Sequence, residues 1–501
     1  MFSLDRDSST PLADQIEQRL HALIQSAQLP PGARLNSIRQ LAAQLGVSPN
    51  TVVSAYDRLV AAGLIDSRGT AGFFVADSPA NAMPDATRVE AGEEQEAVWL
   101  AQQANDQKAG LLLASSGALP ATWLEDAVPA AAVQRGLARA TAGMASRCPP
   151  QGLPELRERI AMLLRGQGVA VDAGRVLTTY GGTHAIDLIC RTFLRPGDTV
   201  AVETPGYFLL FDRLRQAGAT IVPVPRRHDG IDLDALDAAC TQHRPRLLFI
   251  QSVLHNPTGW GSSAANLHRV LMLAQRHHVL IAEDDVQGHF HPQTPHPPTR
   301  LAQLSGLDGV IYYSSFAKAM SPALRLGYIA AEPELLKPLM REKILSVLTT
   351  AALNEFVMLE VLAAGRWRKH LDRLQQRLGA ARVSAARQLR EAGVQLEHAG
   401  EGGLFLWGAL PAGVDVDGLV KEAFRRGILL VRGATFAADG AADPHLRFNV
   451  AFSQQPRLAE FLREQLGAAT SARLVLERAR GPLPLSAPRP DAADAASPRR
   501  R

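Results

Sequence analysis

Tyr313-Ser314-Ser315-Phe316-Ala317-Lys318-Ala319-Met320-Ser321-Pro322-Ala323-Leu324-Arg325-Leu326-Gly327 is the stretch from which the rest of the 501-residue chain can be interpreted. The apolar run before it, at 310–312, is typical of a short buried strand. Lys318 stands among small and apolar residues, where a cation is costly to bury but an amine is useful if an aldehyde occupies it as a Schiff base. Arg325 offers a planar guanidinium that suits a phosphate, and Ser315 offers a hydroxyl beside it. An aldehyde together with a phosphate indicates pyridoxal 5'-phosphate (PLP), although a surface lysine in a serine-rich loop would show the same pattern.

Length and composition favour a large protein of two or three domains. No apolar run is as long as a membrane span, and the N-terminus lacks the charged-then-apolar order of a signal peptide, so we expect a cytoplasmic protein. Cys148, Cys190 and Cys240 are far apart and odd in number, which favours reduced thiols over a disulfide framework or a zinc site. The formal net charge is +4, but residues 469–501 alone hold seven arginines against three acids, so the basic total says little about nucleic-acid binding.

Residues 1–78 carry the pattern of a small helical unit with a hairpin. Apolar residues at helical spacing predict a first helix at 11–25 and a short second helix at 37–45. Ser48 can cap a third helix that runs to about residue 61. A glycine-rich tip between two apolar runs then predicts a hairpin at 63–75. We expect the inner face of the third helix to consist of Val52, Tyr56, Leu59 and Val60.

Two short helices joined by a glycine-containing turn and followed by a hairpin describe a winged helix-turn-helix. The segment resembles the GntR family of bacterial regulators in Ser37-Ile38-Arg39-Gln40-Leu41-Ala42 and in Leu45-Gly46-Val47-Ser48-Pro49-Asn50-Thr51-Val52. The resemblance implies that Arg39, Ser48, Asn50 and Thr51 face DNA, and that Arg68, Gly69 and Thr70 form a wing tip at the minor groove. The family often has arginine where this chain has Pro49, so a target sequence cannot be carried over. A protein-interaction module is the alternative, which the net charge of −1 up to Asp77 mildly favours.

Residues 79–109 lose strong patterning and predict a linker that carries an acidic cluster at Glu90, Glu93, Glu94 and Glu96. If it is flexible, ~30 residues give a reach of roughly 30 Å, enough for the N-terminal unit to lie against a neighbouring subunit. The end of the chain, 469–501, is rich in proline, alanine and arginine, and we expect it to be a disordered basic tail.

Between residues 110 and 468 helical patterns alternate with short apolar runs, which predicts an α/β domain with a mostly parallel sheet. We expect a large part at 110–332 and a smaller α+β part at 333–468 that contains the apolar segments 402–407 and 445–450. The expected strands of the large part are 199–203, 220–224, 246–251, 279–282, 310–313 and 326–330.

Polar motifs next to these segments predict more of the cofactor site. Gly182 and Thr183 enter a helix whose N–H groups can hold a phosphate, although an ordinary turn is the alternative. Tyr207 follows the 199–203 strand and can stack on a pyridine ring or simply pack. Asn256, within His255-Asn256-Pro257-Thr258-Gly259, can donate a hydrogen bond to a ring oxygen. Asp284 can pair with a protonated pyridine nitrogen or, with the adjacent Asp285, bind a metal, but the histidine spacing nearby matches no standard metal site.

In the order Gly-Gly, Tyr, Asn, Asp, Lys, Arg and a final Arg447, these parts resemble the fold-type-I PLP-dependent enzymes, which have the aspartate aminotransferase-like fold. The resemblance covers nearly all of 110–468. It implies an internal aldimine at Lys318 and a clamp for a substrate carboxylate at Arg447. It further implies cofactor contacts by Gly182, Thr183, Tyr207, Asn256, Asp284, Ser315 and Arg325.

A GntR-like winged helix fused to an aminotransferase-like domain resembles the MocR-type regulators. Relatives usually have a tyrosine that hydrogen-bonds the ring oxygen at the position of Gln287, and another, near Arg147 here, that contacts the cofactor phosphate of the partner subunit. A glutamine amide can donate a hydrogen bond but cannot titrate as a phenol does, whereas Arg147 can substitute as a phosphate ligand. Both departures are compatible with PLP binding and favour a sensor over an efficient enzyme.

The sequence therefore predicts a homodimeric, PLP-dependent transcription regulator that binds double-stranded DNA and senses an amino compound, or PLP itself, through an aldimine at Lys318. A coupling of ~1–3 kcal/mol between the two sites is typical of such control. An active aminotransferase of the 2-aminoadipate type with an accessory N-terminal module is the alternative. A third hypothesis is a DNA-binding scaffold whose PLP site is vestigial.

Overall fold

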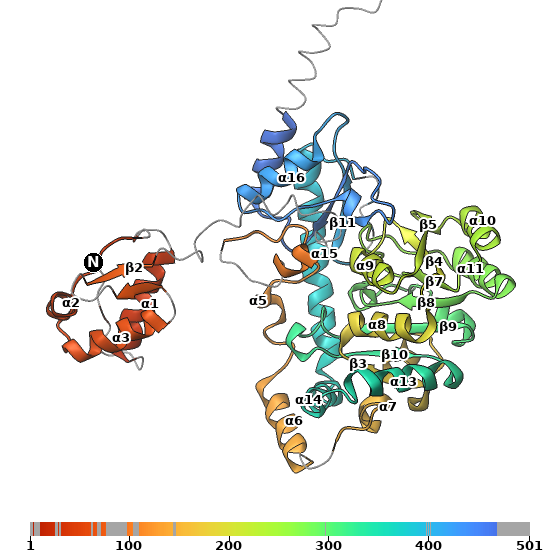
Figure 1. The fold of residues 1–501 in the computed structure, drawn as a ribbon, viewed down its shortest axis with the longest axis horizontal. Helices are drawn as coiled ribbons and strands as arrows, with labels where there is room; N and C mark the ends of the chain where they lie inside the picture. The colour runs from red at the N-terminus through yellow and green to blue at the C-terminus, as the bar shows by residue number, and fades with distance from the viewer. Residues whose placement is uncertain are drawn as a thin grey trace, which may run out of the picture. The chain divides into compact units, whose positions relative to one another are not determined.

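Three short helices and a two-stranded sheet form the first unit of the chain, Met1–Arg88 (Figure 1). The structure, a computed structural model, describes residues 4, 11–25, 29, 32–61, 64–67, 72–76, 98–103, 110–143, 147–295, 297–396, 398, 400 and 402–467. The elements of the first unit are α1 (Leu12–Gln25), α2 (Ile38–Leu45), α3 (Pro49–Ala61), β1 (Ile65–Ser67) and β2 (Phe73–Val75), and β1 pairs with β2 in antiparallel register.

Local capping explains where these helices begin and end. Ser37 and Gln40 form a reciprocal capping box at the start of α2, and Gly46 ends that helix with a left-handed φ of 63°. The Ser48 hydroxyl accepts from the Thr51 N–H at 3.1 Å, so Ser48 caps α3 as predicted. Val52, Tyr56 and Leu59 of α3 are buried, but Val60 is 38% exposed, so its predicted place in the core is wrong.

An eight-stranded sheet with helices on both faces dominates the second unit, Val89–Arg501. The strand order is β3-β10-β9-β8-β7-β4-β5-β6, and the β4–β5, β4–β7, β7–β8 and β8–β9 pairs are parallel. The bounds are β3 (Val176–Thr179), β4 (Thr199–Thr204), β5 (Thr220–Arg227), β6 (Gly230–Ile231), β7 (Leu247–Ile250), β8 (Leu280–Asp284), β9 (Val310–Ser315) and β10 (Gly327–Ala330). All six expected strands are present, and the sheet is mostly parallel, which confirms the predicted fold class.

The two faces of this sheet bury alternate residues of each strand in two separate cores. Ile311 and Tyr313 of β9 pack against one set of helices, whereas Val310 and Tyr312 pack against the other. The first set is α8 (Gly181–Phe193), α9 (Phe208–Gln216) and α13 (Pro333–Val347). The second set includes α7 (Pro154–Gly166), α10 (Leu233–His243), α11 (Ala264–His277), α12 (Leu301–Ser305), α14 (Ala352–Ala363) and α15 (Arg366–Glu391).

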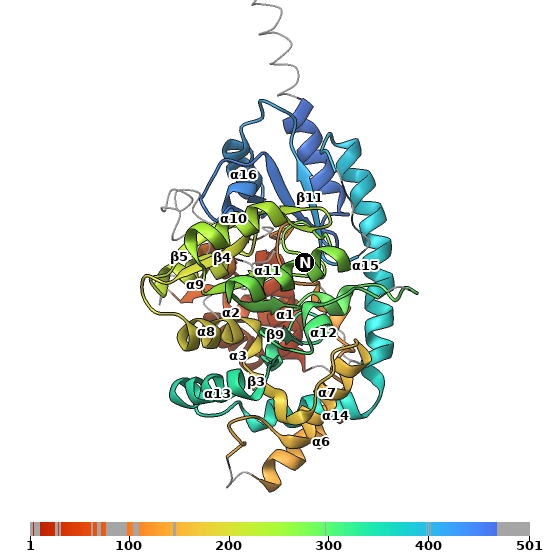
Figure 2. The same ribbon diagram turned by 90° about the vertical axis from the view of Figure 1, so that its right-hand side faces the viewer.

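The smaller part of the second unit is a three-stranded antiparallel sheet held against the 26-residue helix α15 (Figure 2). Its strand order is β11 (Phe405–Ala409), β13 (His445–Asn449), β12 (Val431–Arg432), and α16 (Val416–Arg425) precedes β12. The buried Arg382 of α15 donates to the carbonyl oxygens of Gly403 and Phe405 at 3.1 and 3.0 Å, which fixes the start of β11. The segment before α5 (Ala121–Leu124) and α6 (Ala130–Ala142) joins this part through Ser115 N–H, which donates to Leu429 at 3.0 Å.

All three cysteines are buried and free of disulfide bonds. Burial raises the pKa of Cys148 and of Cys190 to about 12 and that of Cys240 to about 11. These thiols therefore stay protonated at neutral pH. Among the residues that the structure describes, no helix is both long enough and apolar enough to cross a lipid bilayer.

Candidate functional site

A cavity of about 570 Å³ lies where β4, β7, β8 and β9 end. Parallel strands bring their carboxyl ends to one edge of a sheet, which is where ligands bind in open α/β folds. The cavity is lined by every residue predicted for the cofactor and the substrate: Gly182, Thr183, Tyr207, Asn256, Asp284, Ser315, Lys318, Arg325 and Arg447. Residues far apart in the sequence thus meet in one place.

Lys318 follows β9 and presents its amine to this cavity. Its Nζ donates to the Gly117 carbonyl oxygen at 3.2 Å. Burial, reinforced by the nearby charge of Arg447, lowers the pKa of Lys318 to about 8, although Asp284 acts in the opposite direction. A lysine in this state has an appreciable neutral fraction near physiological pH, and the neutral amine is the form that attacks an aldehyde.

Asp284 and Asp285 point to opposite faces of the sheet and have separate partners. Asp284 lines the cavity, accepts from the Val286 N–H at 2.9 Å and from the Tyr313 hydroxyl, and burial raises its pKa to about 6. Asp285 instead accepts from Arg300 Nε at 2.8 Å and from the Tyr312 hydroxyl at 2.5 Å. Only one of the two carboxylates therefore faces the cavity, where it can pair with a protonated ring nitrogen.

The first turn of α8 and the loop after β9 form one end of the cavity. No side chain caps α8, so its leading N–H groups remain available to an anion. A Cβ at Gly181 would lie 3.4 Å from Arg325 Nη2 and 3.5 Å from Ser315 Oγ, so the helix start and these two groups converge. Arg325 has a left-handed φ of 44° and donates to the Tyr180 carbonyl oxygen at 3.2 Å. This end of the cavity suits a phosphate.

Arg447 occupies another part of the cavity, on β13. Its Nη1 donates to Asn256 Oδ1 at 2.7 Å and its Nε to the Ser115 carbonyl oxygen at 3.1 Å. The guanidinium lies 4.4 and 4.6 Å from the ring centroids of Phe405 and Phe436, and burial lowers its pKa to about 9. No carboxylate of the described residues pairs with this cation, so a ligand carboxylate can do so.

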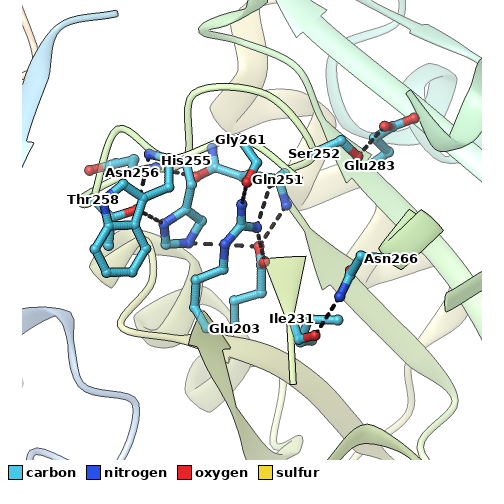
Figure 3. Close-up of polar contacts among 12 residues, drawn as sticks. Glu203, Ile231, Gln251, Ser252, His255, Asn256, Thr258, Gly261, Asn266 and Glu283 are labelled. Atoms are coloured by element: carbon cyan, nitrogen blue, oxygen red, sulfur yellow. Dashed lines mark hydrogen bonds and ion pairs between the residues drawn. The ribbon is translucent and has the colours of Figure 1, made fainter. Parts of the chain in front are cut away.

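A buried hydrogen-bond network holds the Asn256 loop in place (Figure 3). Gln251 Oε1 accepts from the Asn256 N–H at 2.7 Å, and the Gln251 N–H donates to Glu203 Oε2 at 2.7 Å. Arg226 forms an ion pair with Glu203 and donates to the Gln251 carbonyl oxygen at 2.9 Å. His255 lies with its Nδ1 2.9 Å from Thr258 Oγ1, and burial holds its pKa well below the usual range, so it is neutral. Sequence reasoning missed Glu203, Arg226 and Gln251, because their roles depend on pairing across β4, β5 and β7.

Gln287 and Arg147 differ in their relation to the cavity. The Gln287 side chain lines it, is only 2% exposed, and its Oε1 has no hydrogen-bond partner among the described residues. Tyr207 also lines it and shares a hydrogen bond with the Thr183 hydroxyl, and burial raises its pKa to about 12. Arg147 is exposed and lies outside the lining of this cavity.

The predicted DNA-facing residues of the first unit lie around the start of α2 and α3. Arg39, Ser48 and Asn50 are exposed and Thr51 is half-buried. The Ser48 and Thr51 hydroxyls lie 2.8 Å apart, so this capping pair and Asn50 share the first turn of α3, the end that favours phosphate. The predicted wing tip, Arg68, Gly69 and Thr70, lies outside the described residues.

The groups around the cavity fit pyridoxal phosphate. A partly neutral lysine suits its aldehyde, an ionisable buried Asp284 suits its ring nitrogen, and the start of α8 with Arg325 suits its phosphate. The unsatisfied Gln287 Oε1 marks a further polar position at the cavity wall.

Comparison with known families matches both units. Residues 111–464 match the family described as aminotransferase class I and II, and residues 12–75 match the bacterial regulatory proteins of the gntR family.

Individual relatives match either one unit or both. The 2-aminoadipate transaminase of Thermus thermophilus is 30% identical over 370 residues, 73% of this chain and 91% of that protein. The uncharacterized HTH-type transcriptional regulator YdcR of Escherichia coli is 29% identical over 477 residues, 92% of this chain and 99% of that one. The probable rhizopine catabolism regulatory protein MocR of Rhizobium meliloti is 31% identical over 396 residues, 75% of this chain and 76% of that one.

Solved structures agree with the second unit. The crystal structure of LysN, the α-aminoadipate aminotransferase of Thermus thermophilus, complexed with N-(5'-phosphopyridoxyl)-L-leucine, has a TM-score of 0.66 at 28% identity. The match covers 78% of this chain and 97% of the LysN chain.

Proposed function

The chain belongs to the class I and II aminotransferase family and to its MocR-type regulators, which carry a GntR-type DNA-binding domain, and from that premise we propose that an amino acid bound beside Lys318 controls how the protein binds its operator. The aminotransferase-like domain takes pyridoxal 5'-phosphate, and the GntR-type domain binds DNA. The finer proposal concerns the effector and the residues that recognise it.

The observation that carries this proposal is the buried Arg447. Its guanidinium lines the same cavity as Lys318 and has no carboxylate partner among the described residues, so the carboxylate of an incoming amino acid can pair with it. When bound, the cofactor supplies an aldehyde that exchanges one amine for another. Arg447 would orient the amino acid, Lys318 would be the amine that holds the aldehyde, and Asp284 would pair with the protonated ring nitrogen.

We assign the remaining contacts on the same grounds. Gly182, Thr183, Ser315 and Arg325 hold the phosphate, and Tyr207 and Asn256 contact the ring. On the DNA side we propose Arg39, Ser48, Asn50 and Thr51, together with the predicted wing residues Arg68, Gly69 and Thr70. The proposed assembly is a cytoplasmic homodimer in which the exposed Arg147 reaches the cofactor phosphate of the other subunit.

A second candidate is a working aminotransferase, which the similarity to the Thermus thermophilus 2-aminoadipate transaminase favours. The Gln287 amide supports sensing instead, because it cannot gain and lose a proton as a phenol does. The two candidates differ in whether a keto acid leaves the protein in repeated turnovers.

The test is to titrate the PLP-loaded protein with amino acids and to follow the cofactor absorbance together with binding to the intergenic DNA beside its gene. We expect both signals to change at the same amino acid concentration. Lys318→Ala should abolish both responses, and the exposed Lys337→Ala is the matched control, since Lys337 pairs only loosely with Glu334 at 3.5 Å.

An effector response that survives in Lys318→Ala contradicts the proposal. Rapid, repeated release of a keto acid favours the enzyme instead. If dialysed cofactor-free protein and PLP-loaded protein already differ in operator binding without any amino acid, PLP itself is the signal.

A further inference from the structure

Helix α15 carries a one-sided row of basic side chains that the cofactor site does not use. The row consists of the exposed residues Arg366, Lys369, Arg373, Arg377, Arg387 and Arg390. At 3.6 residues per turn, these six positions fall within an arc of about 140° around the helix axis. The opposite face of α15 is buried, with Trp367, Leu374, Leu378 and Leu389 in the hydrophobic core. The core therefore fixes the direction in which the row faces.

Few carboxylates neutralise this row. Within α15, Arg387 lies 4.0 Å from Glu391, and both side chains are largely exposed. Asp372 accepts instead from the Gln293 amide at 2.6 Å. The other five basic residues of the row have no ion pair with any residue that the structure describes. The positive charge of the row lies in two groups, at 366–377 and at 387–390, and no basic residue of the row lies between Arg377 and Arg387.

The N-terminal end of the row borders a hollow of about 780 Å³. Arg366, Lys369 and Arg373 line it, together with Asp372 of the same helix and with Glu125 and Asp126 in its other wall. No side chain caps the first turn of α15, so the positive end of the helix dipole adds to these three cations. Three cations thus meet three carboxylates at this end of the row, and the helix start adds positive potential there.

The length of the row matches the repeat of a duplex. At 1.5 Å per residue, Arg366 and Arg390 are separated by roughly 36 Å along the helix, close to one turn of B-DNA. Figure 2 shows α15 along the flank of the second unit, with no other helix drawn over its outer side. The segment at 289–293 contacts this flank, since Gln293 donates to Asp372 at 2.6 Å and Gln375 donates to the His291 carbonyl oxygen at 2.7 Å.

We propose that the basic row of α15 is a second DNA-binding surface, which contacts the phosphates of DNA that flanks the operator. The inference rests on the proposed function, because the GntR-type domain of the same chain brings DNA close and so raises its effective concentration at α15. Contacts of this kind are independent of sequence and release counterions, so they make binding steeply dependent on salt.

The experiment compares the PLP-loaded variants Lys369→Gln/Arg373→Gln/Arg377→Gln and Arg244→Gln/Arg269→Gln/Arg276→Gln with the wild type. The control triple removes the same charge from exposed positions outside α15. Kd is measured against salt concentration on three duplexes: a short operator duplex, a long operator duplex with flanks, and a long duplex without the operator. Melting temperature and cofactor absorbance verify that each variant is folded.

On both long duplexes, the α15 triple is expected to bind at least about tenfold more weakly than the control, with a salt slope reduced by about two to three, or roughly 0.9 per lost phosphate contact. Binding to the short duplex should be unchanged. Equal salt slopes for the two triples on the long duplexes overturn the inference. A wild type that does not distinguish operator from non-operator DNA overturns the proposed function instead, and the duplex without operator still decides the role of α15.

Discussion

Lys318 and Asp284 share one cavity, and burial has moved their pKa values in opposite directions. The pKa of Lys318 is lowered to about 8 and that of Asp284 is raised to about 6. Between these values the carboxylate is ionised and part of the amine is neutral, which is the combination that attachment of an aldehyde and protonation of a ring nitrogen require.

The pH dependence of cofactor uptake follows from the lysine. Its pKa in the folded protein lies below the ordinary 10.5, so the neutral amine accumulates as the pH rises through about 8 rather than above 10. The rate of PLP attachment to cofactor-free protein should therefore rise from pH 7 to about 8.5 and then level off. Between pH 8 and 10.5 this lysine is more fully protonated in the unfolded chain than in the folded protein. The free energy of unfolding of the cofactor-free protein should therefore also rise with pH between about 8 and 10.5. Stopped-flow absorbance measures the rate, and a rate that climbs steadily to pH 10.5 contradicts the expected pKa.

Gln287 allows a second test by substitution. An unsatisfied buried acceptor costs roughly 1–3 kcal/mol, so Gln287→Leu should leave the stability of the cofactor-free protein unchanged or raised. The same change should weaken PLP binding, because a polar position at the cavity wall is lost. Gln287→Tyr should retain binding and introduce a pH-dependent cofactor absorbance. Thermal melting and PLP titration measure the two effects, and a destabilised Gln287→Leu with unchanged PLP affinity would show that the side chain is only structural.

At the scale of elements, a buried charged cluster joins β3, α13 and α14. Lys343 of α13 donates to Thr178 Oγ1 of β3 at 3.2 Å, and that hydroxyl donates to Glu355 Oε1 of α14 at 2.6 Å. Glu355 Oε2 also accepts from the Leu153 N–H at 2.6 Å. Lys343 and Glu355 are fully buried, so each depends on the other and on the bridging hydroxyl.

The two charges of this cluster should not contribute independently to the free energy of unfolding. Glu355→Ala leaves the Lys343 cation buried and should lower the free energy of unfolding of the second unit by about 3–5 kcal/mol. Lys343→Met/Glu355→Leu should lose clearly less than the sum of the two single changes. Tryptophan fluorescence in a denaturant titration reports only this unit, because all five tryptophans lie beyond residue 88. Additive losses would show that the two charges do not interact.

The elements that could be predicted are those whose burial is uniform. Strands such as β7 and β9 are covered on both faces, so they appear in the sequence as unbroken apolar runs, and the polar residues at their ends identified Lys318, Asp284 and Asn256. Ser115 and Gly117 could not be found this way, because they contribute backbone carbonyl oxygens to Arg447 and Lys318. The prediction that Val60 is buried was wrong for a related reason. Val60 lies at the border of the buried face of α3, where helical periodicity does not separate core from surface.

At the scale of the whole molecule, the two units are thermodynamically coupled if an effector controls DNA binding. An amino acid that changes operator affinity by a given factor, typically 5- to 150-fold, must itself bind with an affinity changed by the same factor when the operator is present. Titrating the amino acid with and without saturating operator measures this factor. Arg39→Ala/Asn50→Ala, which changes the proposed DNA contacts alone, should bind the amino acid equally in both conditions. Unequal factors in the two directions of the wild-type cycle would show that a further binding event is involved.

The buried cysteines have a practical consequence for observing this coupling. With thiol pKa values of about 11 to 12 and no exposed sulfur, the native chain should hardly react with maleimide or methanethiosulfonate reagents at neutral pH. A cysteine introduced on the exposed side of α3 and another on α15 would then be the only labelled positions. Spin labels or fluorophores at these two sites could report the distance between the first unit and the second unit as effector and operator are added.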